Sequence, residues 1–217
     1  MRYKYVIYDW NGTLLDDTVM CHSILNSLLS ERGKPTISFE HYRDIFTFPI
    51  KNYYIKAGFD FSSESYESIA EKYVPLFNSK CRECKLAEGA EEMLEACSRA
   101  GIIQMVLSAT EQNMLVSQLK QFGINNYFVS ALGLGDPYAR SKVELGTKEL
   151  VEKNINPKDV VMIGDTEHDY DVAKAIGCDI ILYSEGHQPY ERLIKLTDKI
   201  FTNFGDIMKF VLMTNDE

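Results

Sequence analysis

The chain has 217 residues, of which 45% are hydrophobic and 25% are charged, and this ordinary globular composition excludes a disordered or fibrous chain. Its 32 acidic and 23 basic residues give a formal net charge of −9, a field that repels polyanions and argues against nucleic-acid binding. The five scattered cysteines predict reduced thiols, and no run approaches the roughly 20 apolar residues of a membrane span. We therefore expect a cytoplasmic protein that does not bind membranes, whose oligomeric state the sequence leaves open.

The first predicted element is a buried strand from Tyr5 to Tyr8, which ends at Asp9 and a turn-forming Asn11-Gly12 pair. Four similar apolar runs follow along the chain: Ile102 to Leu107, Tyr127 to Leu132, Val160 to Ile163 and Asp179 to Tyr183. Amphipathic helical stretches alternate with them: Gly89 to Ala100, Gln112 to Phe122, Ser141 to Asn154 and Asp171 to Ile176. This alternation predicts an α/β fold, a Rossmann-like doubly wound parallel sheet.

The segment between the first two strands, about residues 19–84, breaks this alternation because it contains no strand signal. Its apolar residues recur at helical spacing in three sets, so it is predicted to be entirely helical. We expect a core domain of residues 1–16 and 85–217 and a helical cap domain of residues 17–84, placed to close over whatever binds the core. Cys81 and Cys84 in this segment have the spacing of a metal or redox pair, but a second pair is missing and we attribute the spacing to chance.

Polar residues follow the predicted strands, at the edge where doubly wound sheets bind ligands. Asp9, Asp165 and Asp169 would repel one another unless a cation lay between them, and Mg²⁺ is the natural candidate. Ser108 and Lys142 would offer a hydroxyl and an ammonium group to phosphate oxygens. Singly, these residues have ordinary structural explanations, such as a turn or a helix cap, but together at these strand ends they favour a phosphate site.

With these residues in place, the chain resembles the haloacid dehalogenase superfamily, in its phosphoglycolate phosphatase-like group with a helical cap. The resemblance spans nearly the whole chain. The first motif of the family, Asp-x-Asp-Gly-Thr, is matched by Asp9-Trp10-Asn11-Gly12-Thr13, the second by Ser108, the third by Lys142, with Lys148 a poorer candidate, and the fourth by Gly164 to Asp169.

The resemblance implies the roles of these residues. Asp9 would be the nucleophile and a Mg²⁺ ligand, and the further metal ligands would be Asn11, through its backbone carbonyl, Asp165 and Asp169. The phosphoryl group would be held by Gly12, Thr13, Ser108, Ala109 and Lys142. We assign no chemistry to Trp10, which faces the other way along the strand. The implied activity is Mg²⁺-dependent hydrolysis of a small phosphorylated metabolite through an aspartyl phosphate.

Asn11 departs from the family pattern, because the phosphatases carry there a second Asp that protonates the leaving alcohol and then activates water. A neutral amide does neither, so we expect a slow enzyme or one whose leaving groups need no proton. Candidates for the missing acid are Glu167, His168 and His187. The alternatives are a phosphate-binding or regulatory module with little turnover, and a phosphonatase or phosphotransferase. A phosphonatase needs a cap lysine, for which the sequence offers Lys34, Lys51, Lys56, Lys72 and Lys80. The substrate itself depends on cap residues near 46–52.

Overall fold

The computed structural model describes residues 2–135 and 141–213. Its centre is a six-stranded sheet in the order β5-β4-β1-β6-β7-β8, in which every neighbouring pair is parallel. The strands are β1 (Tyr5–Tyr8), β4 (Ile103–Glu111), β5 (Phe128–Leu134), β6 (Val160–Gly164), β7 (Asp179–Tyr183) and β8 (Ile200–Phe201). Within the described residues, no helix combines the length and the apolar character needed to cross a membrane.

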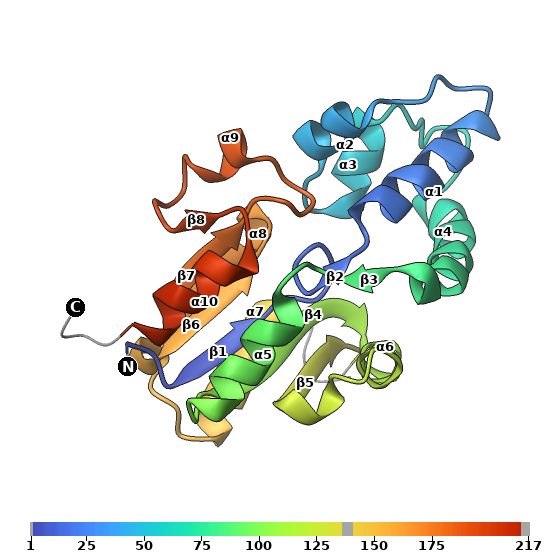
Figure 1. Cartoon of the computed structure of the whole chain (residues 1–217). Helices are drawn as coiled ribbons and strands as arrows, with labels where there is room; N and C mark the ends of the chain where they lie inside the picture. Colours follow the sequence, from blue (N-terminus) through green and yellow to red (C-terminus); the bar gives the residue numbers. More distant parts are fainter. Residues whose placement is uncertain (1, 136–140, 214–217) are drawn as a thin grey trace.

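Helices cover both faces of this sheet (Figure 1). They are α5 (Ala90–Arg99), α6 (Gln112–Gln121), α7 (Lys142–Glu152), α8 (Glu167–Ile176), α9 (Tyr190–Leu193) and α10 (Phe204–Leu212), with 3-10 turns η2 (Asn125–Tyr127) and η3 (Pro157–Asp159). The predicted doubly wound parallel fold is confirmed. The sequence did not predict β8, α9 or α10.

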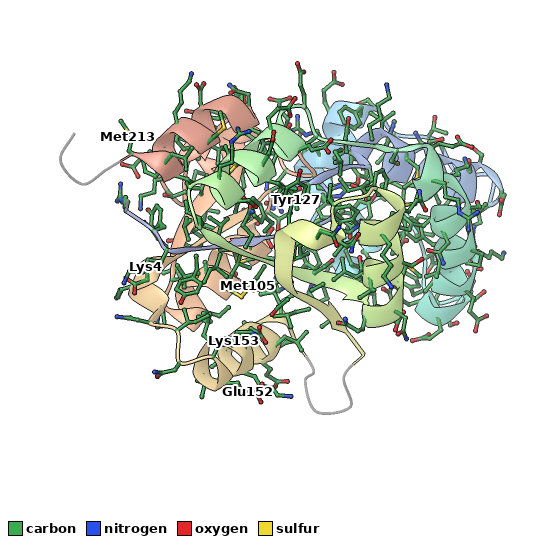
Figure 2. All side chains as sticks on the ribbon, turned by 60° about the horizontal axis from the view of Figure 1, so that its bottom comes forward. Lys4, Met105, Tyr127, Glu152, Lys153 and Met213 are labelled. Carbon is green, nitrogen blue, oxygen red and sulfur yellow. The ribbon has the colours of Figure 1, made fainter. Side chains whose placement is uncertain are left out.

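The strand β1 shows why the strand sequences are continuously apolar and do not alternate with polar residues. Val6 and Tyr8 pack into one core with α5 and α10, whereas Ile7 packs into a second core with α7 and α8 on the opposite face. Because both faces are covered, Val6, Ile7 and Tyr8 are buried although they point to alternate faces. Figure 2 shows the contrast between Met105, inside the second core, and Glu152 and Lys153, which lie on the surface.

The segment of about residues 19–84, between β1 and α5, consists of helices and their connections, as predicted. It contains α1 (Thr18–Ser30), α2 (Phe39–Ile45), α3 (Ile50–Lys56), α4 (Tyr66–Lys80) and the 3-10 turn η1 (Cys81–Glu83). The sequence did not predict α2. Two short antiparallel strands, β2 (Leu15–Asp16) and β3 (Lys85–Leu86), pair where the chain leaves and re-enters the sheet domain (Figure 1). This pairing fixes both ends of the helical segment at one point beside the sheet.

Two predicted boundaries are wrong in ways that matter for the site. The strand predicted to stop at Leu107 continues to Glu111, because a register shift against β5 accommodates extra residues between Leu107 and Glu111. The helix predicted from Asp171 begins at Glu167, because Thr166 and Asp169 form a reciprocal capping box. Asp169 therefore lies in the first turn of a helix rather than in a loop.

Candidate active site

The site lies at the carboxyl ends of β1, β4 and β6, where the strand order reverses. The chain runs from β1 to β4 and β5 on one side and then returns to β6 on the other, so the ends of β1 and its two neighbours form a crevice. A cavity of about 380 Å³ lies there, between these strand ends and the helices α1 to α4. Asp9, Asn11, Ala109, Lys142, Asp165 and Asp169 all line it. Of the predicted site residues, Gly12, Thr13 and Ser108 lie behind its surface.

Three carboxylates converge at this crevice, as the sequence predicted. Ligand oxygens of Asp9, Asp165 and Asp169 lie within 4.8 Å of one another, and all three residues are buried. Burial raises the pKa of Asp9, and the neighbouring carboxylate of Asp169 raises it further. Burial also raises the pKa of Asp165. The chain alone thus leaves negative charge uncompensated here, which a cation would neutralise.

Lys142 lies between two of these carboxylates. Its Nζ is 2.8 Å from Asp9 Oδ1 and 2.7 Å from Asp169 Oδ1, and only 3% of the residue is exposed. Burial opposes the charged form of this lysine, but the two carboxylates outweigh burial and hold its pKa above the ordinary value. The same ammonium lowers the pKa of Asp169 despite burial. Lys148, the poorer candidate, is exposed further along α7.

Asp169 is fixed by the helix that it starts. Its second oxygen, Oδ2, accepts hydrogen bonds from Thr166 Oγ1 at 2.7 Å and from Thr166 N at 3.1 Å. A carboxylate at a helix N-terminus also interacts favourably with the helix dipole. Asp169 therefore presents Oδ1 to Lys142 in one orientation.

Asp165 is held by the two loops that face it. Thr13 Oγ1 donates to Oδ1 at 3.0 Å and His187 N donates to Oδ2 at 2.6 Å. Gly12, with a φ of +72°, and Gly186 approach this carboxylate so closely that a Cβ on either would lie 2.3 Å from Oδ2. Only glycine fits at these two positions. The hydrogen bond from Thr13 supports the Asp165 carboxylate from the same side.

Ser108 is fully buried within β4, and its hydroxyl oxygen accepts a hydrogen bond from Thr110 N at 3.0 Å. Its neighbours Ala109 and Thr110 reach the cavity wall. Trp10 also lies outside the wall, since its ring is buried in the core and its Nε1 donates to Gln118 Oε1 at 2.7 Å.

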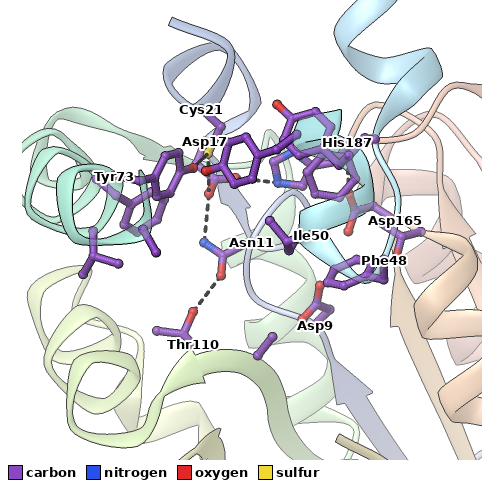
Figure 3. A pocket seen from close by; sticks show the side chains of 18 of the residues that line it. Asp9, Asn11, Asp17, Cys21, Phe48, Ile50, Tyr73, Thr110, Asp165 and His187 are labelled. Atoms are coloured by element: carbon purple, nitrogen blue, oxygen red, sulfur yellow. Dashed lines mark hydrogen bonds and ion pairs between the residues drawn. The ribbon is translucent and has the colours of Figure 1, made fainter. Parts of the chain in front are cut away.

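Asn11 lies at the centre of the pocket (Figure 3). Its Nδ2 donates to Asp17 Oδ2 at 2.8 Å, and its Oδ1 accepts from Thr110 Oγ1 at 2.7 Å. Both ends of the amide are therefore bound, and the first of these bonds needs an amide donor at residue 11. Local sequence patterns do not indicate Asp17 as this partner.

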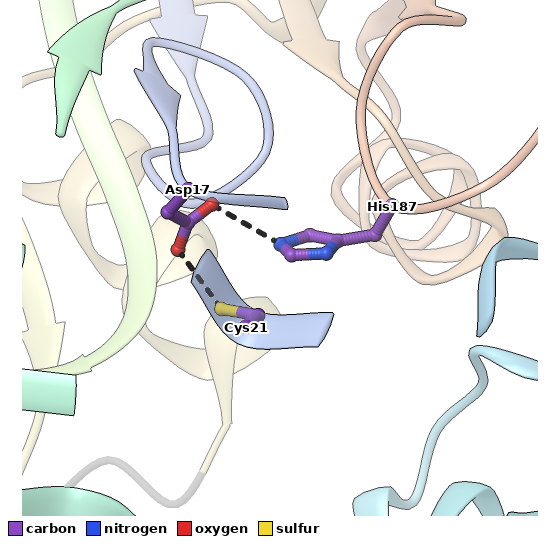
Figure 4. A group of neighbouring side chains, drawn as sticks. All are labelled: Asp17, Cys21 and His187. Carbon is purple, nitrogen blue, oxygen red and sulfur yellow. Dashed lines mark hydrogen bonds and ion pairs between the residues drawn. The ribbon is translucent and has the colours of Figure 1, made fainter. Parts of the chain in front are cut away.

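Asp17 belongs to a second buried cluster, with Cys21 and His187 (Figure 4). Its Oδ1 accepts from Gly12 N at 2.8 Å and lies 3.3 Å from His187 Nε2, and its Oδ2 lies 3.6 Å from Cys21 Sγ. Burial raises the pKa of the Cys21 thiol well above its ordinary value, so this thiol stays protonated. Asp17 thus fastens the loop after β1 to the start of α1.

Of the three candidates for the missing acid, only His187 lines the pocket. Tyr42 OH lies 2.7 Å from its Nδ1, Asp17 binds its Nε2, and its ring stacks on Phe46 with 4.5 Å between centroids. Burial opposes the charged form of His187, but Asp17 outweighs burial and raises the pKa. Both ring nitrogens are engaged.

The other two candidates lie outside the pocket wall. Glu167 binds Arg192, with 2.5 Å between its Oε2 and the guanidinium nitrogen. His168 lies in the first turn of α8 and stacks on Phe48, and burial lowers its pKa. The structure therefore does not bring either side chain to Asn11.

Comparisons with known proteins agree with this geometry. A profile of haloacid dehalogenase-like hydrolases matches residues 6–183. The phosphoglycolate phosphatase of Vibrio parahaemolyticus is 27% identical over 194 residues, which cover 81% of each protein. A tyrosine-protein kinase of Mycobacterium tuberculosis is 25% identical over 205 residues, covering 94% of this chain and 70% of that protein. The structure of a haloacid dehalogenase-like family hydrolase from Streptococcus pneumoniae matches this chain with a TM-score of 0.80 at 19% sequence identity. The match covers 96% of this chain and 98% of that one, and it shows that the two share a fold.

Proposed function

The chain belongs to the haloacid dehalogenase-like hydrolase family, and from this premise we propose that it is a Mg²⁺-dependent phosphatase that uses Asp9 as its nucleophile. The single observation that carries the proposal is the convergence of Asp9, Asp165 and Asp169 with Lys142 at the switch point of the sheet. The relatives named as phosphatases support the same reaction class.

The donor set fits Mg²⁺, which prefers oxygen ligands. The proposed ligands are Asp9, Asp165 and the backbone carbonyl of Asn11, with Asp169 close behind. A bound Mg²⁺ would neutralise charge on the phosphoryl oxygens and on the carboxylates. The support comes from the chain itself, where close buried carboxylates raise the pKa of Asp9.

In the proposed reaction, a carboxylate oxygen of Asp9 forms a bond to phosphorus while the ester bond to the leaving group breaks. Lys142 opposes the rise in the pKa of Asp9 that burial and Asp169 cause, and it would offer its ammonium to the phosphoryl oxygens. Ala109, at the cavity wall, would adjoin the bound phosphate, and Ser108, Gly12 and Thr13 would support the proposed phosphate site from directly behind this wall. Water then hydrolyses the aspartyl phosphate and releases inorganic phosphate.

We also propose that residues 17–84 act as the cap over a core formed by residues 1–16 and 85–217. Residues of α1, α2, α3 and α4 line the same cavity as Asp9 and Lys142, which supports this division. The substrate would then be enclosed between the two parts, and the cap side chains would select its leaving group.

The rival function is a phosphate-binding module with little turnover, and Asn11 is the observation that favours it. A phosphotransferase is also consistent with the relative named as a kinase. The phosphonatase alternative has less support, because none of the five cap lysines lines the described pocket.

Hydrolysis of acetyl phosphate with Mg²⁺ tests the proposal, because this small substrate has a leaving group that needs no proton. We expect phosphate release that stops with EDTA and with Asp9→Asn. The matched control is Asp198→Asn, which removes an exposed carboxylate outside the pocket and should leave the rate unchanged. If the folded wild-type protein releases no phosphate from acetyl phosphate, the proposed function is wrong.

A further inference from the structure

The cap side of the pocket is strongly aromatic. Beyond Asn11 the cavity is walled by side chains from the helical segment, several of which appear in Figure 3. These wall residues are Tyr42, Phe46, Phe48, Ile50, Tyr53, Tyr54, Tyr66, Ala70, Tyr73, Val74 and Phe77. The cavity volume of about 380 Å³ falls in the range of small-molecule sites, about 300–1,000 Å³.

This wall offers no positive charge. Residues 17–84 are all described, and the only charged side chain that they contribute to the cavity is the acid Asp17. Three of the cap cations have partners elsewhere: Arg32 binds Glu64, Arg43 donates to the backbone carbonyls of Ser184 and Gln188, and Lys51 lies over the ring of Phe61. A carboxylate on the leaving group would therefore be desolvated without a partner.

The tyrosines of the wall remain neutral. Burial raises the pKa of Tyr42, Tyr53, Tyr54 and Tyr73 above the ordinary tyrosine value. Their hydroxyls thus add no charge, and their rings present apolar surface and aromatic edges to a ligand. Aromatic pairs of this kind stabilise a bound ring beyond simple area burial.

Among the residues that the structure describes, the pocket also lacks a side chain placed to protonate a leaving group. Asn11 is an amide, and both ring nitrogens of His187 are engaged by Tyr42 and Asp17. Glu111, at the pocket wall, caps α6, and the hydrogen bonds from Asn113 N and Met114 N lower its pKa, so it stays ionised. The leaving group must then depart as an anion.

These two properties select the same chemistry. A phenol has a pKa of about 10, as in the tyrosine side chain, whereas water and simple alcohols hold their protons to about 16. A phenolate therefore departs without an acid, and its ring matches an aromatic wall to which the cap contributes no cation. Resting on the proposed phosphatase function, we propose that this site acts on monophosphate esters of phenols rather than on small anionic esters such as phosphoglycolate.

The proposed reaction needs no reactant besides the ester and water. An oxygen of Asp9 forms a bond to phosphorus, and the bond between phosphorus and the aryl oxygen breaks. The phenolate leaves with the electron pair and takes a proton from solvent. Water then attacks the aspartyl phosphate, regenerates the carboxylate and releases inorganic phosphate.

One further contact is consistent with a ligand in the aromatic part of the cavity. Asn78, next to Phe77 on α4, lines the cavity, and its buried Oδ1 accepts no hydrogen bond within the described part of the chain. Buried polar atoms normally find a partner. A hydroxyl or ammonium substituent on the phenol would supply one.

Four substrates separate the possibilities: acetyl phosphate, phenyl phosphate, benzyl phosphate and phosphoglycolate, each assayed with Mg²⁺. We expect kcat/KM for phenyl phosphate to exceed that for phosphoglycolate by more than about 100-fold, because a single methylene in an apolar pocket already changes kcat/KM about 10- to 200-fold. Benzyl phosphate carries the ring but leaves as an alkoxide, so it should bind with a similar KM and a much lower kcat.

The variant Ile50→Lys tests the wall directly, since it places a cation in the pocket. It should lower kcat/KM for phenyl phosphate at least about tenfold and raise that for phosphoglycolate. The matched control is Ile55→Lys on the same helix, because Ile55 is 52% exposed and does not line the cavity. A thermal unfolding curve confirms that each variant is folded.

The outcomes distinguish the two proposals. If acetyl phosphate is hydrolysed but phosphoglycolate equals or exceeds phenyl phosphate, the phenol inference is overturned while the phosphatase function stands. Equal KM values for phenyl phosphate and phosphoglycolate would also overturn it, because the wall would then contribute nothing to binding. Failure with acetyl phosphate would instead overturn the underlying function.

Discussion

Restoring the carboxylate at residue 11 tests both the chemistry and the geometry of the pocket. Asn11 Nδ2 donates to Asp17 Oδ2 at 2.8 Å, so Asn11→Asp would place two carboxylate oxygens at that separation. With an effective dielectric constant of about 20, two charges at 2.8 Å repel by about 6 kcal/mol. This repulsion corresponds to about four pKa units, so the pair retains one proton near neutral pH.

The single variant should therefore lose stability as pH rises. The carboxyl groups of residues 11 and 17 share one proton, and the pKa of this pair in the folded variant lies above the unfolded value of about 3.9. The free energy of unfolding is therefore unaffected below about pH 3.9 and falls as pH rises through the folded pKa. The double variant Asn11→Asp, Asp17→Asn reverses the hydrogen bond between residues 11 and 17, because the new amide at residue 17 then donates to the carboxylate at residue 11. Its remaining oxygen can still accept from Gly12 N. The double variant should therefore be the more stable of the two at alkaline pH.

The assay is kcat for benzyl phosphate, whose alkoxide needs a proton, alongside urea unfolding at pH 5 and pH 9. A general acid and base contributes about 10²- to 10⁴-fold, and we expect the double variant to gain within that range. Acetyl phosphate, as the control, should change little. The reasoning would be refuted by a folded double variant that is no faster on benzyl phosphate, or by a single variant as stable as wild type at pH 9.

Three other predictions follow from individual contacts. Lys142→Met leaves two buried carboxylates without their cation, so it should abolish phosphate release and lower the free energy of unfolding by about 3–5 kcal/mol in urea. Trp10→Phe removes the donor to Gln118 and should lower the free energy of unfolding by about 1–3 kcal/mol in the same assay. The kcat for phenyl phosphate should stay unchanged, and a lower kcat would contradict the placement of Trp10 in the core. Burial alone would raise the pKa of Asp179, but its hydrogen bonds from Lys199 and Tyr3 together lower the pKa. Asp179 therefore stabilises the fold above its unfolded pKa, and this stabilisation is lost as pH falls. The Tm difference between wild type and Asp179→Asn should shrink on acidification.

The sequence by itself determined the fold and the edge of the sheet at which the carboxylates gather. Period and composition placed β1, β6 and β7 at their observed ends or within one residue, because strands buried on both faces must be continuously apolar. In parallel sheets the carboxyl ends of neighbouring strands meet, so residues such as Asp9 and Asp165 could be placed together without coordinates. The departure at Asn11 was also visible in the sequence alone.

The tertiary structure alone decided what surrounds that edge. The contacts of Asn11 with Asp17 and of His187 with Tyr42 join residues on separate elements, and no local periodicity encodes such pairs. The apolar residues of the cap helices predicted burial, but not which of them would line a cavity rather than fill a core. That choice depends on how four helices pack over the sheet, because helical spacing defines a face and only packing defines what the face meets.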